Sequence, residues 1–143
     1  MRRFILAFTI LAALLAACSS SQATQSNEKP GKPIAVSGGE YQDISTAELK
    51  TMLENKDFVF VNVHIPFEGD IPDTDLSIPY DEISQHLNLL PADKDAKIVL
   101  YCRSDRMSMI AAEELVRQGY TDIYNLDGGF LTWEQQGFPI EGR

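Results

Sequence analysis

The sequence contains little cysteine and little histidine. Its 143 residues include two cysteines, Cys18 and Cys102, and two histidines, His64 and His86. Two cysteines are too few to build a disulfide-stabilised scaffold, and these four residues show no metal-ligand spacing. The sequence therefore excludes a structural zinc site, and we expect no metal to be bound.

Basic residues are also scarce. The chain carries 12 Lys and Arg against 21 Asp and Glu, which gives a formal net charge of -9. Nucleic-acid affinity comes largely from clustered Lys and Arg, and no basic stripe is present, so we expect no nucleic-acid partner. Apolar residues make up 44% of the chain, which favours one folded domain over a disordered chain.

The amino-terminal segment is typical of an export signal. Two arginines precede an apolar run over residues 4–17 that is too short to span a bilayer as a stable helix. The end of this run, Leu15-Ala16-Ala17-Cys18, resembles the lipobox of bacterial lipoproteins, in which the cysteine is lipidated and becomes the first mature residue. We therefore expect a signal peptide over residues 1–17 and an exported protein, facing the periplasm or the cell exterior, that is anchored to the bacterial membrane through a lipid on Cys18. The alternative is an ordinary signal peptide, with Cys18 an incidental thiol.

A polar segment follows the expected anchor. Residues 19–39 are mostly Ser, Gln, Thr, Asn, Lys, Pro and Gly, so residues 18–39 are interpreted as the lipidated cysteine and a flexible tether. Residues 40–143 then remain for one compact domain, which is long enough for a single core. With Cys18 lipidated, Cys102 is the only thiol left in a compartment where cysteines usually pair, so we expect it to have a function.

The periodicity of the domain predicts an α/β fold. A capping box, Ser45-Thr46-Ala47-Glu48, predicts a helix from Thr46 to about Glu54. Further strands are expected over residues 58–63, 76–78, 97–101 and 122–126, and further helices over residues 81–87, 108–118 and 130–136. This alternation implies a small, mostly parallel sheet flanked by helices on both faces. Ligands of such sheets bind beyond the carboxyl ends of the strands, and Cys102 lies at such an end.

The surroundings of Cys102 favour a reactive thiolate. The residue follows a buried strand on a loop that opens a helix, where backbone N–H groups without partners and the helix dipole stabilise an anion. Arg103 and Arg106 add two positive charges. These effects favour the thiolate, which is the nucleophilic form. The alternative, a small apolar residue that ends a strand, explains neither the arginines nor an unpaired thiol in an exported protein.

The loop Tyr101-Cys102-Arg103-Ser104-Asp105-Arg106-Met107-Ser108 resembles the active-site loop of single-domain rhodanese sulfurtransferases. The segment Asp127-Gly128-Gly129-Phe130-Leu131-Thr132-Trp133 and the residues after it are similar to the family's closing turn and helix, so the resemblance covers about residues 41–140. It implies a rhodanese-like fold without metal or organic cofactor, acting on small sulfur-containing substrates. Cys102 would take a sulfane sulfur from a donor such as thiosulfate, become a persulfide, and pass the sulfur to a thiol or to cyanide.

The resemblance also implies roles for the loop residues. Backbone amides of six residues would hold the terminal sulfur, and the two arginine side chains would attract or orient the donor. The six residues are Arg103, Ser104, Asp105, Arg106, Met107 and Ser108.

Several positions depart from the family's pattern. Asn62 and His64 stand where the family usually has Asp and Arg, and Asp70 stands where it usually has His. Asp105 occupies a common glycine position, and Met107 takes the place of the usual last arginine. A carboxylate at residue 105 opposes a thiolate unless it points away or is paired, and a positive φ there would strain an aspartate.

His64 has two interpretations. It follows the end of a predicted strand, so it could reach the face that carries Cys102 and act as a proton donor or a substrate contact. The other interpretation is a loop histidine that only hydrogen-bonds nearby backbone.

Three other functions compete with sulfur transfer. A non-catalytic rhodanese-like binding module at the cell envelope would use the same loop without chemistry. A thiol-based phosphatase usually has an arginine six residues after its cysteine, and that position is Ser108. A disulfide oxidoreductase needs a second cysteine near Cys102, which the sequence does not provide.

Overall fold

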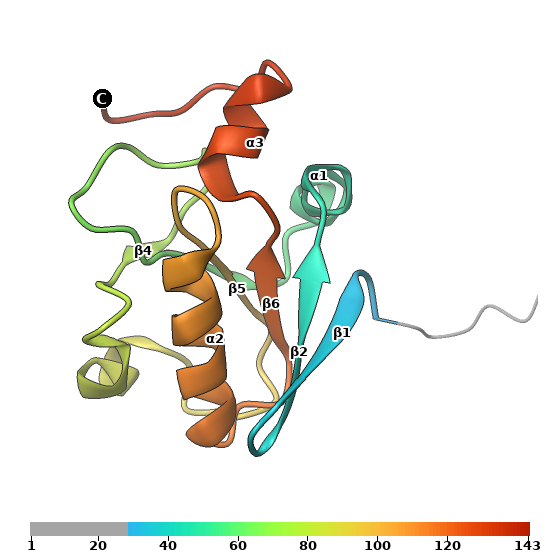
Figure 1. Ribbon diagram of the computed structural model, residues 1–143, viewed down its shortest axis with the longest axis vertical. Coiled ribbons are helices and arrows are strands. Elements are labelled where there is room, and N and C mark those ends of the chain that lie inside the picture. The colour runs from blue at the N-terminus through green and yellow to red at the C-terminus, as the bar shows by residue number, and fades with distance from the viewer. Residues whose placement is uncertain (1–28) are drawn as a thin grey trace, which may run out of the picture.

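The computed structural model describes residues 29–143 (Figure 1). Cys18 and the signal peptide expected over residues 1–17 lie outside the described residues. The strands are β1 (Lys32–Val36), β2 (Gly39–Ile44), β3 (Val59–Asn62), β4 (Leu76–Ser77), β5 (Ile98–Tyr101) and β6 (Ile123–Leu126). The helices are α1 (Thr46–Glu54), α2 (Arg106–Arg117) and α3 (Gly129–Gln135), with short 3₁₀ helices η1 (Ile83–Gln85) and η2 (Leu87–Leu89).

The six strands form one sheet in the order β1-β2-β6-β5-β3-β4. Only the β1–β2 pair is antiparallel, and all other neighbours are parallel. Every residue of β5 and β6 is buried, as expected for central strands covered on both faces. The predicted α/β class with a mostly parallel sheet is confirmed.

Helices cover both faces of this sheet. Successive strand residues point to opposite faces, so Leu100 packs with the buried side of α2 while Val99 packs with Leu49 of α1 and Trp133 of α3. Cys102 belongs to the α2 side. Figure 1 shows α1 and α3 near the end of the sheet to which the β2 and β6 arrowheads point.

The first helix begins where its capping box predicts. The Glu48 N–H donates to Ser45 Oγ at 3.3 Å, and the Ser45 N–H donates to Glu48 Oε2 at 2.7 Å. Two N–H groups without intrahelical partners are thereby satisfied at the start of α1. The helix expected from residue 108 begins at Arg106 instead, with Asp105 as its N-cap residue.

Two expectations are wrong. The segment expected to be a helix over residues 81–87 forms the 3₁₀ helices η1 and η2, because a short polar segment gains too few hydrogen bonds to sustain an α-helix. A flexible tether reaching residue 39 is wrong for β1, which pairs with β2 through a two-residue turn whose Gly38 has φ +96°. Ile34 and Val36 alternate toward the core on the α2 side, but Lys32 and Pro33 before them concealed this short pattern.

Within residues 29–143, no helix combines the length and the apolar character that crossing a membrane requires.

We expect Ser45→Ala to lower the free energy of unfolding by about 1 kcal/mol, the usual cost of losing an N-cap. Urea denaturation measures this change. The matched control is Ser37→Ala in the exposed β1–β2 turn, where no helix begins. Equal stability of the two variants would contradict the importance of the cap.

The cap also predicts a pH dependence. Hydrogen bonds from the Ser45 backbone and hydroxyl lower the pKa of Glu48 below its usual 4.5. A carboxyl group with a lowered folded-state pKa stabilises the fold above its unfolded-state pKa, and this contribution disappears as the pH falls through the folded-state value. The difference in stability between wild type and Ser45→Ala should therefore shrink in acid.

Candidate active site

Cys102 lies directly after β5, at its carboxyl end, and is 2% exposed. It is the only cysteine among the described residues and forms no disulfide there. Its side chain packs with Val63, Leu100 and Ala111 in the core on the α2 side. Only three residues separate it from α2, so the thiol lies at the amino-terminal end of that helix.

The loop after Cys102 leaves a run of amides unpaired. Between Arg103 and Ser108, none of the six backbone N–H groups donates a hydrogen bond to another atom of residues 29–143. The first regular bond is that of Met109, which donates to the Asp105 carbonyl at 2.9 Å. Free N–H groups at a helix start are a site for anions, so this loop can stabilise a negative charge on sulfur.

The start of α3 fixes this loop. The Phe130 N–H donates to the Cys102 carbonyl and the Leu131 N–H donates to the Arg103 carbonyl, both at 3.0 Å. Gly129 has φ +54°, and a Cβ there would overlap the Cys102 carbonyl oxygen and lie 2.7 Å from the Arg103 carbonyl carbon. Glycine is therefore required where α3 meets the loop, a requirement that the Gly-Gly pair alone did not reveal.

Ser108 is the side-chain hydrogen-bond partner of Cys102. Its Oγ lies 3.3 Å from Cys102 Sγ and 2.9 Å from the Asp105 carbonyl oxygen. The hydroxyl has one hydrogen, so it can donate to the carbonyl while the sulfur is a thiol and to the sulfur when it is a thiolate. Ser108 can thus donate a hydrogen bond to Cys102 when its sulfur is the nucleophilic thiolate.

Asp105 does not need a glycine-like backbone. Its φ is -166°, an extended conformation that any residue adopts, so the expected strain is absent. Its carboxylate accepts a hydrogen bond from the Gly128 N–H at 2.9 Å and thereby joins the loop to the β6–α3 turn. Burial raises the pKa of Asp105, and the negative charges of Asp127 and Asp43 raise it further.

The remaining loop residues differ in exposure. Arg103 is half-exposed and lies 3.5 Å from the Glu68 carboxylate, which offsets part of its charge. Arg106 is exposed and forms no ion pair with any residue from 29 to 143. Ser104 is exposed, whereas Met107 is half-buried against the α2-side core. Sequence reasoning missed Glu68, because its partner Arg103 lies 35 positions away and only the fold brings the two together.

Two departures from the family's pattern form one polar network. Asn62 Nδ2 donates to Asp70 Oδ1 at 2.8 Å and to the Gly69 carbonyl at 3.1 Å. Tyr101 donates its hydroxyl hydrogen to the same Asp70 oxygen at 3.1 Å, and burial raises the pKa of Tyr101. Asn62 and Asp70 therefore hold the segment that follows β3 against β5.

His64 lies beside this network and is nearly buried, with 8% of its side chain exposed. Its ring packs edge-on against Phe130, with centroids 5.5 Å apart, and its Nε2 lies 3.7 Å from Glu68 Oε1. Neither ring nitrogen has a hydrogen-bond partner in the described part of the chain. The backbone-bonding interpretation of this side chain is therefore wrong, while a role in substrate contact stays a prediction.

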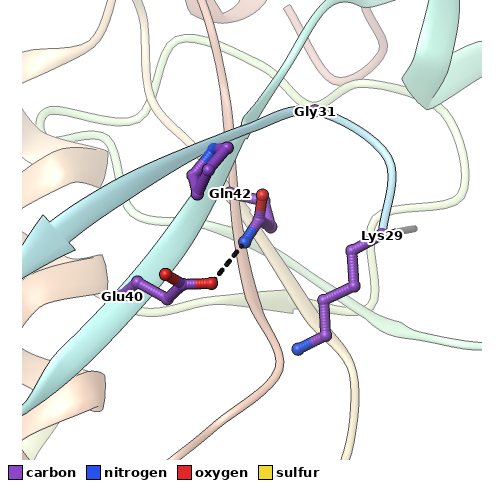
Figure 2. Close-up of a pocket in the computed structure, with 5 residues that line it drawn as sticks. Lys29, Gly31, Glu40 and Gln42 are labelled. Carbon is purple, nitrogen blue, oxygen red and sulfur yellow. Dashed lines mark hydrogen bonds between the residues drawn. The ribbon is translucent and has the colours of Figure 1, made fainter.

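A surface cavity lies away from Cys102, in the β1–β2 region. It has a volume of about 240 Å³ and is lined by Lys29, Gly31, Pro33, Glu40 and Gln42 of the β1–β2 region (Figure 2). Gln42 donates to Glu40 at 3.2 Å across it. No thiol or hydroxyl lines this cavity, and the amine of Lys29 is paired with Asp122 at 2.8 Å, so the chemistry is assigned to the loop after β5.

We expect Asp105→Asn to accelerate the reaction of Cys102 with an anionic sulfur donor by about threefold to tenfold, because one nearby negative charge is removed. The Asn oxygen can still accept from the Gly128 N–H. Since the pKa of Asp105 is raised in the folded state, its charged form is disfavoured there, and the variant should keep its stability at neutral pH.

Stopped-flow kinetics with thiosulfate measures this rate. Asp57→Asn is the matched control, because it changes the net charge equally. Asp57 lies before β3, at the amino ends of the strands, whereas Cys102 lies at the carboxyl end of the neighbouring β5. Equal rates for the two variants would show that Asp105 has no electrostatic effect on the loop.

The fold and the site match known proteins. A family profile for the rhodanese-like domain matches residues 45–136. A sulfurtransferase from Allochromatium vinosum is 36% identical over 92 residues, which cover 62% of this chain and 83% of that protein. A tRNA uridine(34) hydroxylase from Erwinia tasmaniensis is 30% identical over 107 residues, which cover 68% of this chain but only 31% of the hydroxylase.

A solved structure agrees with these matches. The crystal structure of a rhodanese-like domain protein from Staphylococcus aureus is 32% identical with a TM-score of 0.57, covering 70% of this chain and 98% of that one. The family profile spans both the cysteine loop after β5 and the turn into α3 that fixes it. The chain therefore belongs to the rhodanese-like domain family and is a rhodanese-like sulfurtransferase.

Proposed function

We propose that Cys102 carries a sulfane sulfur as a persulfide, taking it from a donor such as thiosulfate and passing it to a thiol or to cyanide. The observation that carries this proposal is the run of six unpaired N–H groups directly after a buried cysteine. A terminal persulfide sulfur is anionic, and such a run is suited to hold it.

The loading step needs no redox partner. The Cys102 thiolate attacks the outer sulfur of thiosulfate, a new S–S bond forms, and the thiosulfate S–S bond breaks with its electron pair leaving on sulfite. Arg106 is the exposed loop cation without an ion-pair partner in residues 29–143, so it is suited to attract the donor. The loop amides then hold the terminal sulfur.

The second step returns the thiolate to Cys102. The acceptor attacks the outer sulfur, and the S–S bond to Cys102 breaks with its electron pair returning to Sγ. The Ser108 hydroxyl, 3.3 Å away, can donate to the thiolate that forms. Thiol and disulfide reactivity both follow the stability of this thiolate.

A second candidate function is a non-catalytic binding module at the cell envelope that uses the same loop. It is favoured by two carboxylates near the loop, those of Asp105 and Glu68, which oppose the attraction of anionic donors. The persulfide experiment below separates the two candidates.

We expect thiosulfate to increase the mass of the protein by one sulfur atom, with turnover to cyanide and to a small thiol, and Cys102→Ala to lose both. Mass spectrometry of the intact protein and a turnover assay measure these outcomes. Ser104→Ala, an exposed change two residues away, is the control for disturbance of the loop. Folded wild-type protein with a titratable thiol but no mass increase, with thiosulfate and with polysulfides, would leave the binding module as the function.

We also propose that the protein is anchored to the bacterial membrane through a lipid on Cys18 and faces the periplasm or the cell exterior. The order of charge, apolar run, small residues and Cys18 supports this anchor. The 13 residues between Cys18 and Lys32 can span at most about 45 Å, which would keep the domain close to the lipid surface.

We expect Cys18→Ala to abolish incorporation of labelled palmitate and to move the protein out of the membrane fraction. Cys102→Ala is the matched control, because it removes a thiol without touching the lipidation sequence. Membrane association that survives Cys18→Ala would contradict a lipid anchor at this residue.

A further inference from the structure

A second cavity lies where β3 and β4 end, at the same end of the sheet as Cys102. It has a volume of about 220 Å³ and is lined by His64, Ile65, Phe67, Ser77, Ile78 and Pro79. Four of these six side chains are apolar, and none carries a fixed positive charge. The cavity is therefore poorly suited to an anionic donor such as thiosulfate.

The strand register places this cavity beside the cysteine loop. Asn62 at the end of β3 pairs with Tyr101 of β5 on one side and with Ser77 of β4 on the other. The pairing continues past the strand ends, where the Val63 N–H donates to the Tyr101 carbonyl and the Ile78 N–H donates to the Asn62 carbonyl, both at 2.9 Å. The residues after β4, β3 and β5 thus lie together at the carboxyl ends of these strands, where ligands of parallel sheets bind.

Two residues connect the His64 ring to the cysteine loop. Phe130 packs against the ring and donates its own N–H to the Cys102 carbonyl. Glu68 lies 3.7 Å from His64 and 3.5 Å from Arg103, the residue after Cys102. His64 therefore lines the cavity and is linked through these two residues to the loop that carries the nucleophile.

The His64 side chain lacks hydrogen bonds that a buried imidazole needs. Both ring nitrogens are buried, neither has a hydrogen-bond partner within residues 29–143, and only 8% of the side chain is exposed. Leaving buried polar atoms unpaired is unfavourable, so a ligand in the cavity that this residue lines could supply the missing bond once the ring turns toward it.

We propose that this cavity binds the acceptor, a small thiol with an apolar body, and that the His64 ring turns into the cavity to hydrogen-bond its S–H group. This inference rests on the proposed persulfide chemistry of Cys102. Ile65, Phe67 and Ile78 contact the apolar body, and the 53% exposed ring of Phe67 forms the outer wall. Donor and acceptor then approach from different sides, the donor past Arg106 and the acceptor past His64.

The transfer step balances without another reactant. As the acceptor sulfur bonds to the outer sulfur of the persulfide, its proton passes to a His64 ring nitrogen. The S–S bond to Cys102 breaks, and its electron pair returns to Sγ as a thiolate. Glu68 beside the ring stabilises the imidazolium that forms, in the way a carboxylate supports a catalytic histidine.

The decisive experiment compares acceptors on one loaded protein. The probes are 2-phenylethanethiol, which has an apolar body, 2-hydroxyethanethiol, which has a polar one, and the cyanide anion, which has neither a body to fill the cavity nor a proton to give up. We expect His64→Gln to lower kcat/KM by roughly tenfold or more for both thiols and to leave cyanide within about twofold of wild type. His86→Gln, a change at the other histidine, beside Glu82 and outside this cavity, should leave all three acceptors unchanged.

A second variant tests the cavity even if His64→Gln does not fold. Phe67→Ala truncates an exposed ring, and we expect the preference for 2-phenylethanethiol over 2-hydroxyethanethiol to fall about fivefold because apolar contact area is lost. Equal losses for thiols and cyanide in His64→Gln, or an unchanged preference in Phe67→Ala, would overturn the acceptor site. Wild-type protein that forms no persulfide would instead overturn the proposed function itself.

Discussion

The site depends on the bonding of the cysteine loop to the start of α3. The first N–H groups of α3 have no partner inside their own helix, and they bond to the carbonyls of Cys102 and Arg103. These bonds fix the direction of the loop peptides, while the N–H groups from Arg103 to Ser108 find no partner among residues 29–143. Gly129 allows this close approach because a side chain there would overlap the loop backbone. The anion site that we propose is thus built almost entirely from main-chain atoms.

Backbone N–H groups can stabilise an anion even in a protein with a negative net charge. The chain has a formal net charge of -9, and Glu68 and Asp105 place carboxylates close to the loop. Long-range attraction of anionic donors is therefore weak, and it is screened beyond roughly 8 to 10 Å in physiological salt. Backbone dipoles act at contact distance and do not depend on the net charge, so the thiolate can be stabilised in spite of its acidic surroundings.

The two flanks of the loop offer different chemistry. On one flank, Arg106 is exposed and has no ion-pair partner in residues 29–143. On the other, the residues after β3 and β4 form a largely apolar cavity that contains His64. The Asn62–Asp70–Tyr101 hydrogen bonds hold this second flank in place, and Asp70 also pairs with Glu141 of the carboxyl-terminal segment. Positions that depart from the family's pattern therefore shape the flank we assign to the acceptor.

Short sequence patterns were enough to predict one helix, three strands and the candidate nucleophile. The capping box placed α1, the apolar runs predicted β3, β5 and β6, and the position of Cys102 between a strand and a helix indicated a nucleophile. The strand β1 was missed, because Lys32 and Pro33 concealed an alternation of only two apolar residues. The folded chain brings Glu68 to Arg103, Gly128 to Asp105 and the ring of His64 to a cavity wall, and no local pattern indicated these contacts. These contacts join segments that are distant along the chain, and local spacing carries no information about which strand ends become neighbours when the sheet forms.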